Sequence, residues 1–251
     1  MLLTPYISGL WLDEGFQIAY NRRNECQKHI HDSLAYYVEN IQRLVLPDYV
    51  PTNEDVLWAN LKTIGITETW LTCMQGIESP FLDVGGMRSE REKWIHTFPK
   101  TTVVMFTVDT TAYARLLFED DTVNRMEEQL ALFDSVVNNQ WFSGSGFVLI
   151  FTKMDLLREW LWRYPVENYF PDYLQYKWLA IEPVEGYMQY LKGRFLKTVQ
   201  SDETAARIGI VQGNLVRGSK DIVSNVLNAI NSLATIYPDL NGLSRSESSA
   251  L

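Results

Sequence analysis

Residues 81–98 read Phe81-Leu-Asp-Val-Gly-Gly-Met-Arg-Ser-Glu-Arg-Glu-Lys-Trp-Ile-His-Thr-Phe98, and the interpretation of the whole chain starts from this stretch. It begins as a short apolar strand that ends in an acid, Asp83, and continues through Gly85 and Gly86 into a charged amphipathic turn. An acid at a strand end can hold a magnesium ion, and a glycine pair lets backbone N–H groups approach a phosphate. The four residues Asp-Val-Gly-Gly alone also fit a strand that ends in a tight turn, whereas the full stretch is more specific.

The composition limits the class of protein. The 251 residues are 46% hydrophobic and 21% charged, as expected of a globular protein with ample material for a core. The formal net charge of -9 argues against a general nucleic-acid binder. Two cysteines, Cys26 and Cys73, are too few for a disulfide framework and indicate a reducing compartment. No apolar run approaches membrane-spanning length, and the first residues do not read as a secretory signal.

Two kinds of periodicity divide the chain. Residues 1–58 read as helices only, with Asp32 or Ser33 capping one helix and Thr52 and Asp55 forming a capping box for another. From residue 64 onward, segments with strand periodicity alternate with segments with helix periodicity, which predicts a mostly parallel sheet with helices on both faces. We expect strands at 66–73, 80–84, 102–108, 147–151 and 207–211, the first two as a hairpin, and helices at 124–137, 183–199 and 221–236.

A second motif, Thr152-Lys153-Met154-Asp155, directly follows the expected strand 147–151. Ligand sites in such sheets lie at the carboxyl ends of the strands. An aspartate placed there can accept from the two donor nitrogens on the edge of guanine, and the lysine stem can lie along the base. The motif looks like the Asn-Lys-x-Asp guanine motif of GTPases, with Thr152 in place of the asparagine. A strand end with loop charges is the alternative for four residues alone, and the spacing from the first motif favours homology.

The chain resembles the alpha subunits of heterotrimeric G proteins from about residue 9 to residue 236. Residues 81–98 closely resemble the switch II segment of that family, and residues 55–69 resemble its switch I in register. Shorter matches follow at 124–128, 132–135, 141–142 and 168–173, the last most like fungal members. The resemblance implies an α/β fold of the Ras-like, P-loop-NTPase type. The implied divisions are a partial helical domain at 1–58, a Ras-like domain at 59–240 and a Ser-rich disordered tail at 241–251.

The resemblance implies a site for GTP or GDP with Mg²⁺. Thr63 and Asp83 match the residues that hold the magnesium ion. The implied nucleotide-binding residues are Asp32, Ser33, Leu57, Trp58, Ala59, Asn60, Asp83, Val84, Gly85, Gly86, Met87, Thr152, Lys153, Met154, Asp155 and Val216.

Neither catalytic residue of the family is intact in this sequence. Asn60 falls where the family carries an arginine that neutralises transition-state charge, and Met87 falls where a glutamine orients the attacking water. Such an arginine is credited with about 10³–10⁵ in rate, or roughly 4–7 kcal/mol. Asparagine has no charge to supply, and methionine offers only a weak sulfur acceptor. If GTP binds, we therefore expect very slow hydrolysis, and whether the chain is an enzyme stays open.

The phosphate loop of the family, Gly-x-x-x-x-Gly-Lys-Ser, is expected to be missing because the resemblance begins inside the helical domain. The segment from Gly213 to Lys220 has the two-glycine spacing, but Ser219 and Lys220 stand in the reverse order. The resemblance places that segment at a second guanine-contacting loop instead. We do not interpret it as a phosphate cradle.

Other residues match parts of the family that meet partners or hold the activated state. Gly86, Arg91 and Glu128 match a latch that holds switch II when the protein is activated. A solvated ion pair of little energy is the alternative for Arg91 and Glu128. The resemblance implies a beta-gamma dimer and an effector as partners, while an unfamiliar C-terminal segment leaves receptor coupling in doubt.

The residues that match partner-facing surfaces form two pairs. Lys93 and Trp94 match the switch II surface that meets the beta-gamma dimer, and Trp141 and Phe142 match an effector-facing loop. Simple packing under the switch segment is the alternative for Trp94.

Two functions of different classes remain open from the sequence. The first is a guanine-nucleotide-binding signalling switch with impaired hydrolysis. The second is a non-catalytic interaction module that presents the switch II surface to a beta-gamma dimer or an effector. The expected location is the cytoplasm or the inner face of the plasma membrane, without an N-myristoylation motif.

Overall fold

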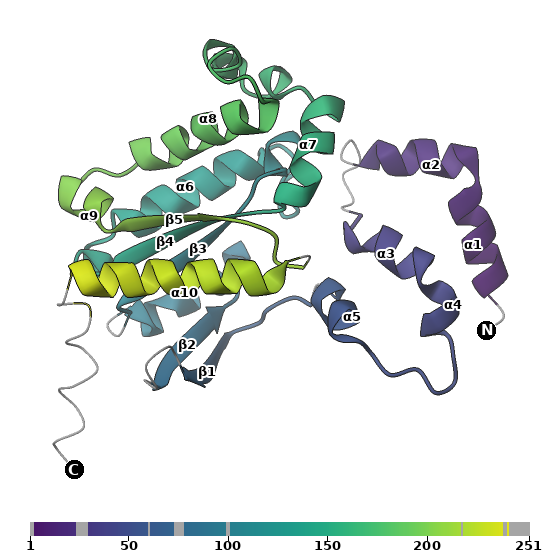
Figure 1. Ribbon diagram of the computed structural model, residues 1–251, viewed down its shortest axis with the longest axis horizontal. Helices are drawn as coiled ribbons and strands as arrows, with labels where there is room; N and C mark the ends of the chain where they lie inside the picture. Colours follow the sequence, from purple (N-terminus) through teal and green to yellow (C-terminus); the bar gives the residue numbers. More distant parts are fainter. Residues whose placement is uncertain are drawn as a thin grey trace. The chain divides into compact units, whose positions relative to one another are not determined.

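The structure is a computed structural model that describes residues 3–23, 30–59, 61–72, 78–98, 101–216, 218–237 and 240. Asn60, Cys26, Cys73 and the predicted tail 241–251 lie outside the described residues. The chain divides into two compact units, which we describe separately (Figure 1). Unit 1 comprises Met1–Leu61 and Arg115–Val123, and unit 2 comprises Lys62–Ala114 and Asn124–Leu251.

Unit 1 is built from short helices, as its sequence predicts. The helices are α1 (Thr4–Leu12), α2 (Glu14–Asn21), α3 (Ser33–Glu39), α4 (Ile41–Leu44) and α5 (Asn53–Trp58). The capping box at α5 is confirmed, because Thr52 and Asp55 each accept a hydrogen bond from the backbone N–H of the other. Helix α3 ends and α4 begins on either side of Asn40, whose side-chain amide donates to Tyr36 O at 2.9 Å. Such local side-chain bonds compete with a continuous helix.

A buried carboxylate joins three helices of unit 1. Both carboxylate oxygens of Asp55 accept from the Arg43 guanidinium, at 2.7 and 2.8 Å, and the Tyr36 hydroxyl donates to Asp55 at 2.7 Å. The bidentate Arg43 bond holds the pKa of Asp55 well below its usual range. The segment Arg115–Val123 is fixed to the same unit by a 2.8 Å bond from Arg115 to Asp32. Charge-assisted hydrogen bonds therefore help to fix how the segments of this small unit pack against one another.

Unit 2 contains a three-stranded parallel sheet in the order β3-β4-β5, which confirms the predicted α/β class. Its strands are β3 (Val103–Asp109), β4 (Gly146–Thr152) and β5 (Ile208–Gln212), and its longest helices are α6 (Arg125–Val137), α7 (Met154–Arg163), α8 (Pro183–Lys197) and α10 (Ser219–Ile236). Helices α6 and α8 cover one face and α10 covers the other (Figure 1). Every residue of β4 is buried, as expected for a central strand covered on both sides.

The predicted hairpin is present as a second, separate sheet. Strands β1 (Ile66–Thr72) and β2 (Glu78–Val84) pair antiparallel, with Ile66 opposite Val84. Among the described residues, neither hairpin strand forms a ladder with β3. The parallel sheet thus contains the three strands expected at 102–108, 147–151 and 207–211, and the hairpin forms a sheet of its own. No helix in the described part of the chain is long and apolar enough to cross a membrane.

Candidate functional site

The guanine-type motif lies at the carboxyl end of β4, where the chain turns directly into α7. Lys153 makes this turn with a left-handed backbone at φ 60°. The buried Thr152 hydroxyl donates to Val108 O at 3.0 Å, and Lys153 Nζ lies 2.8 Å from Asp109 Oδ2 at the end of β3. These two contacts tie the ends of adjacent strands together. Sequence reasoning missed Asp109, although an acid at the end of an expected strand was an available signal.

A second loop reaches the same motif. The backbone N–H of Asp155 donates to Asn214 Oδ1 at 2.9 Å, across 59 positions of sequence. Asn214 belongs to the loop after β5 that also carries Val216. The structure thus brings the predicted guanine motif and the predicted second guanine loop together. Asp155 is exposed at the start of α7, so its carboxylate is accessible to a ligand.

The glycine pair follows β2 and is packed tightly against a glutamate. Gly85 N–H donates to Gly65 O at 3.0 Å, and a Cβ at Gly85 would lie 2.8 Å from Glu90 Cβ and 3.0 Å from Thr63 O. Only glycine fits such an approach without displacing a neighbour. Glu90 Oε2 accepts from Gly65 N–H and from Lys93 Nζ, both at 2.7 Å. The bond from Lys93 lowers the pKa of Glu90.

The same contacts place both predicted magnesium ligands at one end of the hairpin. Thr63 O lies beside Gly85, and Asp83, near the end of β2, is two residues before Gly85. A hydroxyl and a carboxylate are the oxygen donors that Mg²⁺ prefers, and two protein ligands leave its other positions to water and phosphate. The residue types therefore fit the ion. The described residues contain no group of three or more His, Cys, Asp or Glu suited to a metal.

The predicted latch residues are in contact. Arg91 Nη1 lies 2.7 Å from Glu128 Oε1, and Arg91 Nε donates to Gly86 O at 3.1 Å. Arg88 adds a bidentate pair to Glu128, at 2.6 and 3.1 Å, that the sequence did not predict. The guanidinium groups of Arg88 and Arg91 lower the pKa of Glu128 to about 2. The 3₁₀ segment η2 (Arg88–His96) is thereby joined to α6.

The predicted partner surfaces differ in exposure. Trp94 is half-buried against the core, and its indole N–H donates to Gly85 O at 2.9 Å. Lys93 Nζ forms an ion pair with Glu90 Oε2 at 2.7 Å. Trp141 is 53% exposed, whereas Phe142 is 4% exposed and its ring packs 4.7 Å from Phe98. Of this last pair, only the Trp141 side chain is open to solvent.

Five further predicted nucleotide residues belong to unit 1, whereas Val84, Met87 and Met154 lie in unit 2. Asp32 and Ser33 lie at the start of α3, where Asp32 accepts from Arg115. Leu57, Trp58 and Ala59 lie at the end of α5, and the Trp58 ring stacks on Tyr36 with centroids 5.3 Å apart. Their roles toward a nucleotide stay predictions.

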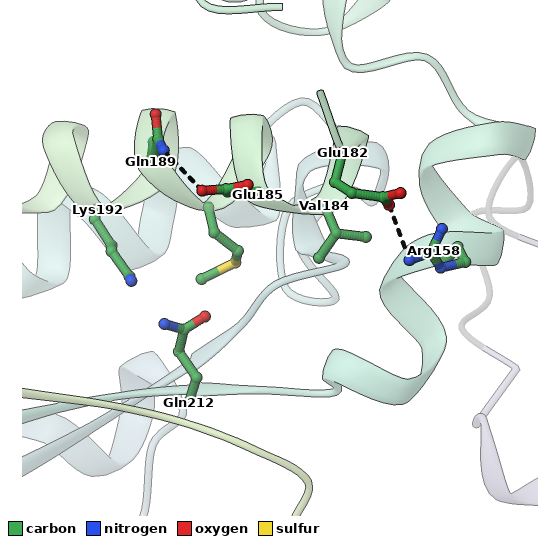
Figure 2. A pocket seen from close by; sticks show the side chains of 8 residues that line it. Arg158, Glu182, Val184, Glu185, Gln189, Lys192 and Gln212 are labelled. Carbon is green, nitrogen blue, oxygen red and sulfur yellow. Dashed lines mark hydrogen bonds and ion pairs between the residues drawn. The ribbon is translucent and has the colours of Figure 1, made fainter. Parts of the chain in front are cut away.

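The chain also contains a cavity of about 550 Å³ between α7, α8 and the end of β5 (Figure 2). It is lined by side chains that include Arg158, Met188, Lys192 and Gln212, and none of its lining residues is among the predicted nucleotide residues. The cavity is therefore a separate feature from the candidate site.

Comparison with known protein families matches residues 3–235 to the family described as G-protein alpha subunit. The chain belongs to the G-protein alpha subunit family. Among curated relatives, guanine nucleotide-binding protein alpha subunits of Pyricularia oryzae and Cryphonectria parasitica and the alpha-1 subunit of Neurospora crassa are each 47% identical over 167 residues. That alignment covers 66% of this chain and 46% of each relative, so the chain spans about half the length of the curated relatives it matches.

The predicted resemblance is confirmed, including the likeness to fungal members. G-protein alpha subunits bind GTP and GDP, generally with Mg²⁺, and typically bind beta-gamma dimers and effectors. The contacts of Gly86 and Lys153 identify positions at which substitutions can test this G-alpha chain for such binding.

Proposed function

We propose that this G-alpha chain is a guanine-nucleotide-binding signalling protein that binds GTP or GDP with Mg²⁺ and hydrolyses GTP very slowly. The observation that carries the proposal is the contact of Arg91 with both Gly86 O and Glu128. Gly86 belongs to the glycine pair that would meet a phosphate, and Glu128 lies on α6. A phosphate that moves the Gly86 backbone therefore also moves a charged contact between η2 and α6.

The proposed roles follow from the donors and acceptors at each position. The Asp155 carboxylate accepts hydrogen bonds from the guanine edge. The aliphatic stem of Lys153 lies along the base, while its ammonium group stays paired with Asp109. Thr63 and Asp83 hold Mg²⁺. Met87 brings no group that can orient water, which supports slow hydrolysis.

Binding of a fluorescent, slowly hydrolysed GTP analogue to the 251-residue chain, with and without Mg²⁺, tests the proposal. We expect magnesium-dependent binding that guanine nucleotides displace and adenine nucleotides do not. The variant Asp155→Asn should weaken binding at least tenfold, because the amide cannot accept both base hydrogens. The control Asp202→Asn, in the first turn of α9 (Asp202–Ala206), should bind like the parent chain. No binding by folded protein, or equal binding by Asp155→Asn, would contradict the proposal.

A second candidate is nucleotide-independent binding of a beta-gamma dimer or an effector. The observation that favours it is that polar groups of the site already have partners within the chain. Glu90 accepts from Gly65 N–H and from Lys93, and Asp109 pairs with Lys153. Such contacts order the switch II segment without a nucleotide. A pull-down with purified beta-gamma dimer in nucleotide-free buffer tests this candidate.

We expect Lys93→Glu to reduce that capture if the switch II surface is used. Capture that requires added GTP or GDP would instead favour the nucleotide-dependent function. Capture unchanged by Lys93→Glu would show that another surface binds the dimer.

A further inference from the structure

Asp109, the last residue of β3, is a buried acid whose two carboxylate oxygens have different partners. Its side chain is 10% exposed. Oδ1 accepts from the backbone N–H and the hydroxyl of Thr111, at 3.0 and 2.7 Å, and Oδ2 lies 2.8 Å from Lys153 Nζ. A buried carboxylate is costly unless its oxygens are hydrogen-bonded and its charge is paired. The two Thr111 bonds fix Oδ1, and with it the direction in which Oδ2 meets the lysine.

The backbone around Asp109 is held from three other elements. Asp109 N–H donates to Gln129 Oε1 of α6 at 2.8 Å. The next residue, Thr110, donates from its hydroxyl to Thr152 O of β4 at 2.8 Å, and its carbonyl accepts from the Tyr187 hydroxyl of α8 at 2.9 Å. Thr110 and Tyr187 are fully buried. Asp109 therefore has little freedom to move, which is a property that a group must have if it is to position another side chain.

Lys153 is held at both ends of its side chain. Its backbone has φ 60°, and no other non-glycine residue in the described part of the chain has a positive φ. A lysine side chain samples many rotamers when its ammonium group is not held. Here the left-handed turn sets the direction of the Cα end, and Asp109 holds the ammonium end, so the four-carbon stem between them has a defined path. The side chain is 32% exposed, so part of the stem remains accessible to a ligand.

We propose that Asp109 is a positioning residue of the base site, which acts by holding the Lys153 stem where a guanine base can lie against it. The inference rests on the proposed nucleotide-binding function and assigns to that function a residue that acts only through Lys153. Asp155 meets the edge of the base by hydrogen bonds, whereas an aliphatic stem meets the face of the ring, which guanine and hypoxanthine share. Loss of the Asp109 charge should therefore weaken binding of both bases by the same factor.

Equilibrium binding of fluorescent, slowly hydrolysed analogues of GTP and of ITP, with Mg²⁺ present, tests the proposal in the 251-residue chain. Asp109→Asn keeps the shape of the side chain and removes its charge, and we expect about tenfold weaker binding of both analogues with their affinity ratio unchanged. Asp155→Asn should instead reduce the preference for the guanine analogue. The matched control Glu167→Gln breaks another Lys–carboxylate pair of unit 2, with Lys177, and should bind both analogues like the parent chain.

A double-mutant cycle separates positioning from a purely structural effect. Lys153→Met keeps an unbranched apolar stem and removes the ammonium group that Asp109 holds, so alone it should weaken both analogues about as much as Asp109→Asn. Adding Asp109→Asn to Lys153→Met should then weaken binding no further. An acid that only stabilised the local fold would weaken binding in both backgrounds. Circular dichroism establishes which variants are folded, and Lys153→Met breaks the pair from its more exposed side, so it tests the proposal even where Asp109→Asn does not fold.

Three results would overturn this role of Asp109 and leave the proposed function intact. One is a parent chain that binds the GTP analogue while Asp109→Asn or Lys153→Met binds it equally well. Another is an Asp109→Asn loss of the same size in the Lys153→Met background. The third is a changed ratio of GTP-analogue to ITP-analogue affinity in Asp109→Asn, because Asp109 would then act on the edge of the base. Absence of binding by the folded parent chain would instead contradict the proposed function, and the role of Asp109 would fail with it.

Discussion

Replacing Glu128 by glutamine should loosen the contact between η2 and α6 without changing the shape of the side chain. The pKa of Glu128 falls from its ordinary value of 4.5 to about 2, chiefly because Arg88 and Arg91 donate to it. At about 1.4 kcal/mol per pKa unit this corresponds to roughly 3.5 kcal/mol at most. The Arg88 side chain is 42% exposed, so water screens the pair, and we expect a loss of about 1–1.5 kcal/mol at pH 7.

The pH dependence distinguishes this cause from a general loss of packing. A carboxylate with a lowered folded-state pKa stabilises the protein above its unfolded-state pKa, and the effect fades as the pH falls from about 4.5 to about 2. The difference in unfolding free energy between Glu128→Gln and the parent chain should therefore shrink over this range. Urea denaturation at a series of pH values, followed by tryptophan fluorescence, measures it.

A neighbouring residue on the same helix supplies the control. Glu127 makes one partly exposed, single-bonded ion pair with Arg194, so Glu127→Gln should cost at most about 0.5 kcal/mol. Trypsin should also cleave after Arg88 and Arg91 faster in Glu128→Gln than in Glu127→Gln. Equal stability losses in the two variants, or a Glu128→Gln loss that persists undiminished near pH 2, would refute the reasoning.

Two further predictions concern packing and charge elsewhere in the chain. Asp55→Asn should speed hydrogen exchange in α3 to α5, because it weakens the bidentate bond from Arg43, and the effect should be present above about pH 4 and fade at lower pH. Unchanged exchange in those helices would contradict this. Gly85→Ala should lower the free energy of unfolding by about 1–3 kcal/mol, because the new methyl meets Glu90 at 2.8 Å. Gly193→Ala, in α8 with open space around it, should instead raise that free energy by up to about 1 kcal/mol, and thermal melts that show the same sign for both would contradict the assignment.

Local sequence patterns predicted the elements whose causes are local. The helix expected at 124–137 forms as α6, and its apolar positions at helical spacing, including Met126 and Phe133, are buried. The Thr52 and Asp55 capping box needs only residues three apart. The break at Asn40 was not predicted, because Leu34, Tyr37, Ile41 and Leu44 follow one helix periodicity through it. The side-chain bond from Asn40 to Tyr36 O competes with the continuous helix.

The sequence predicted the motifs of the candidate site, but only some of the contacts that their residues make. Gly86, Arg91 and Glu128 were singled out because each matches a family position, and the structure brings them into contact. Arg88 and Glu90 were missed, since nothing in the sequence tells which of several charged residues in a row faces a distant carboxylate or backbone N–H.

The sequence by itself determined the family, the order of the strands and of helices α6, α8 and α10, and the positions of the two nucleotide-type motifs, but it did not predict α7. These follow from residue identity and from periodicities of two and about four residues, which are local properties. Only the tertiary structure decided that Lys153 pairs with Asp109, 44 positions away, and that Glu128 holds Arg88, 40 positions away. The reason is that such pairs depend on which strand ends and helix faces the packed core brings together, and a sequence pattern carries no distances between segments far apart in the chain.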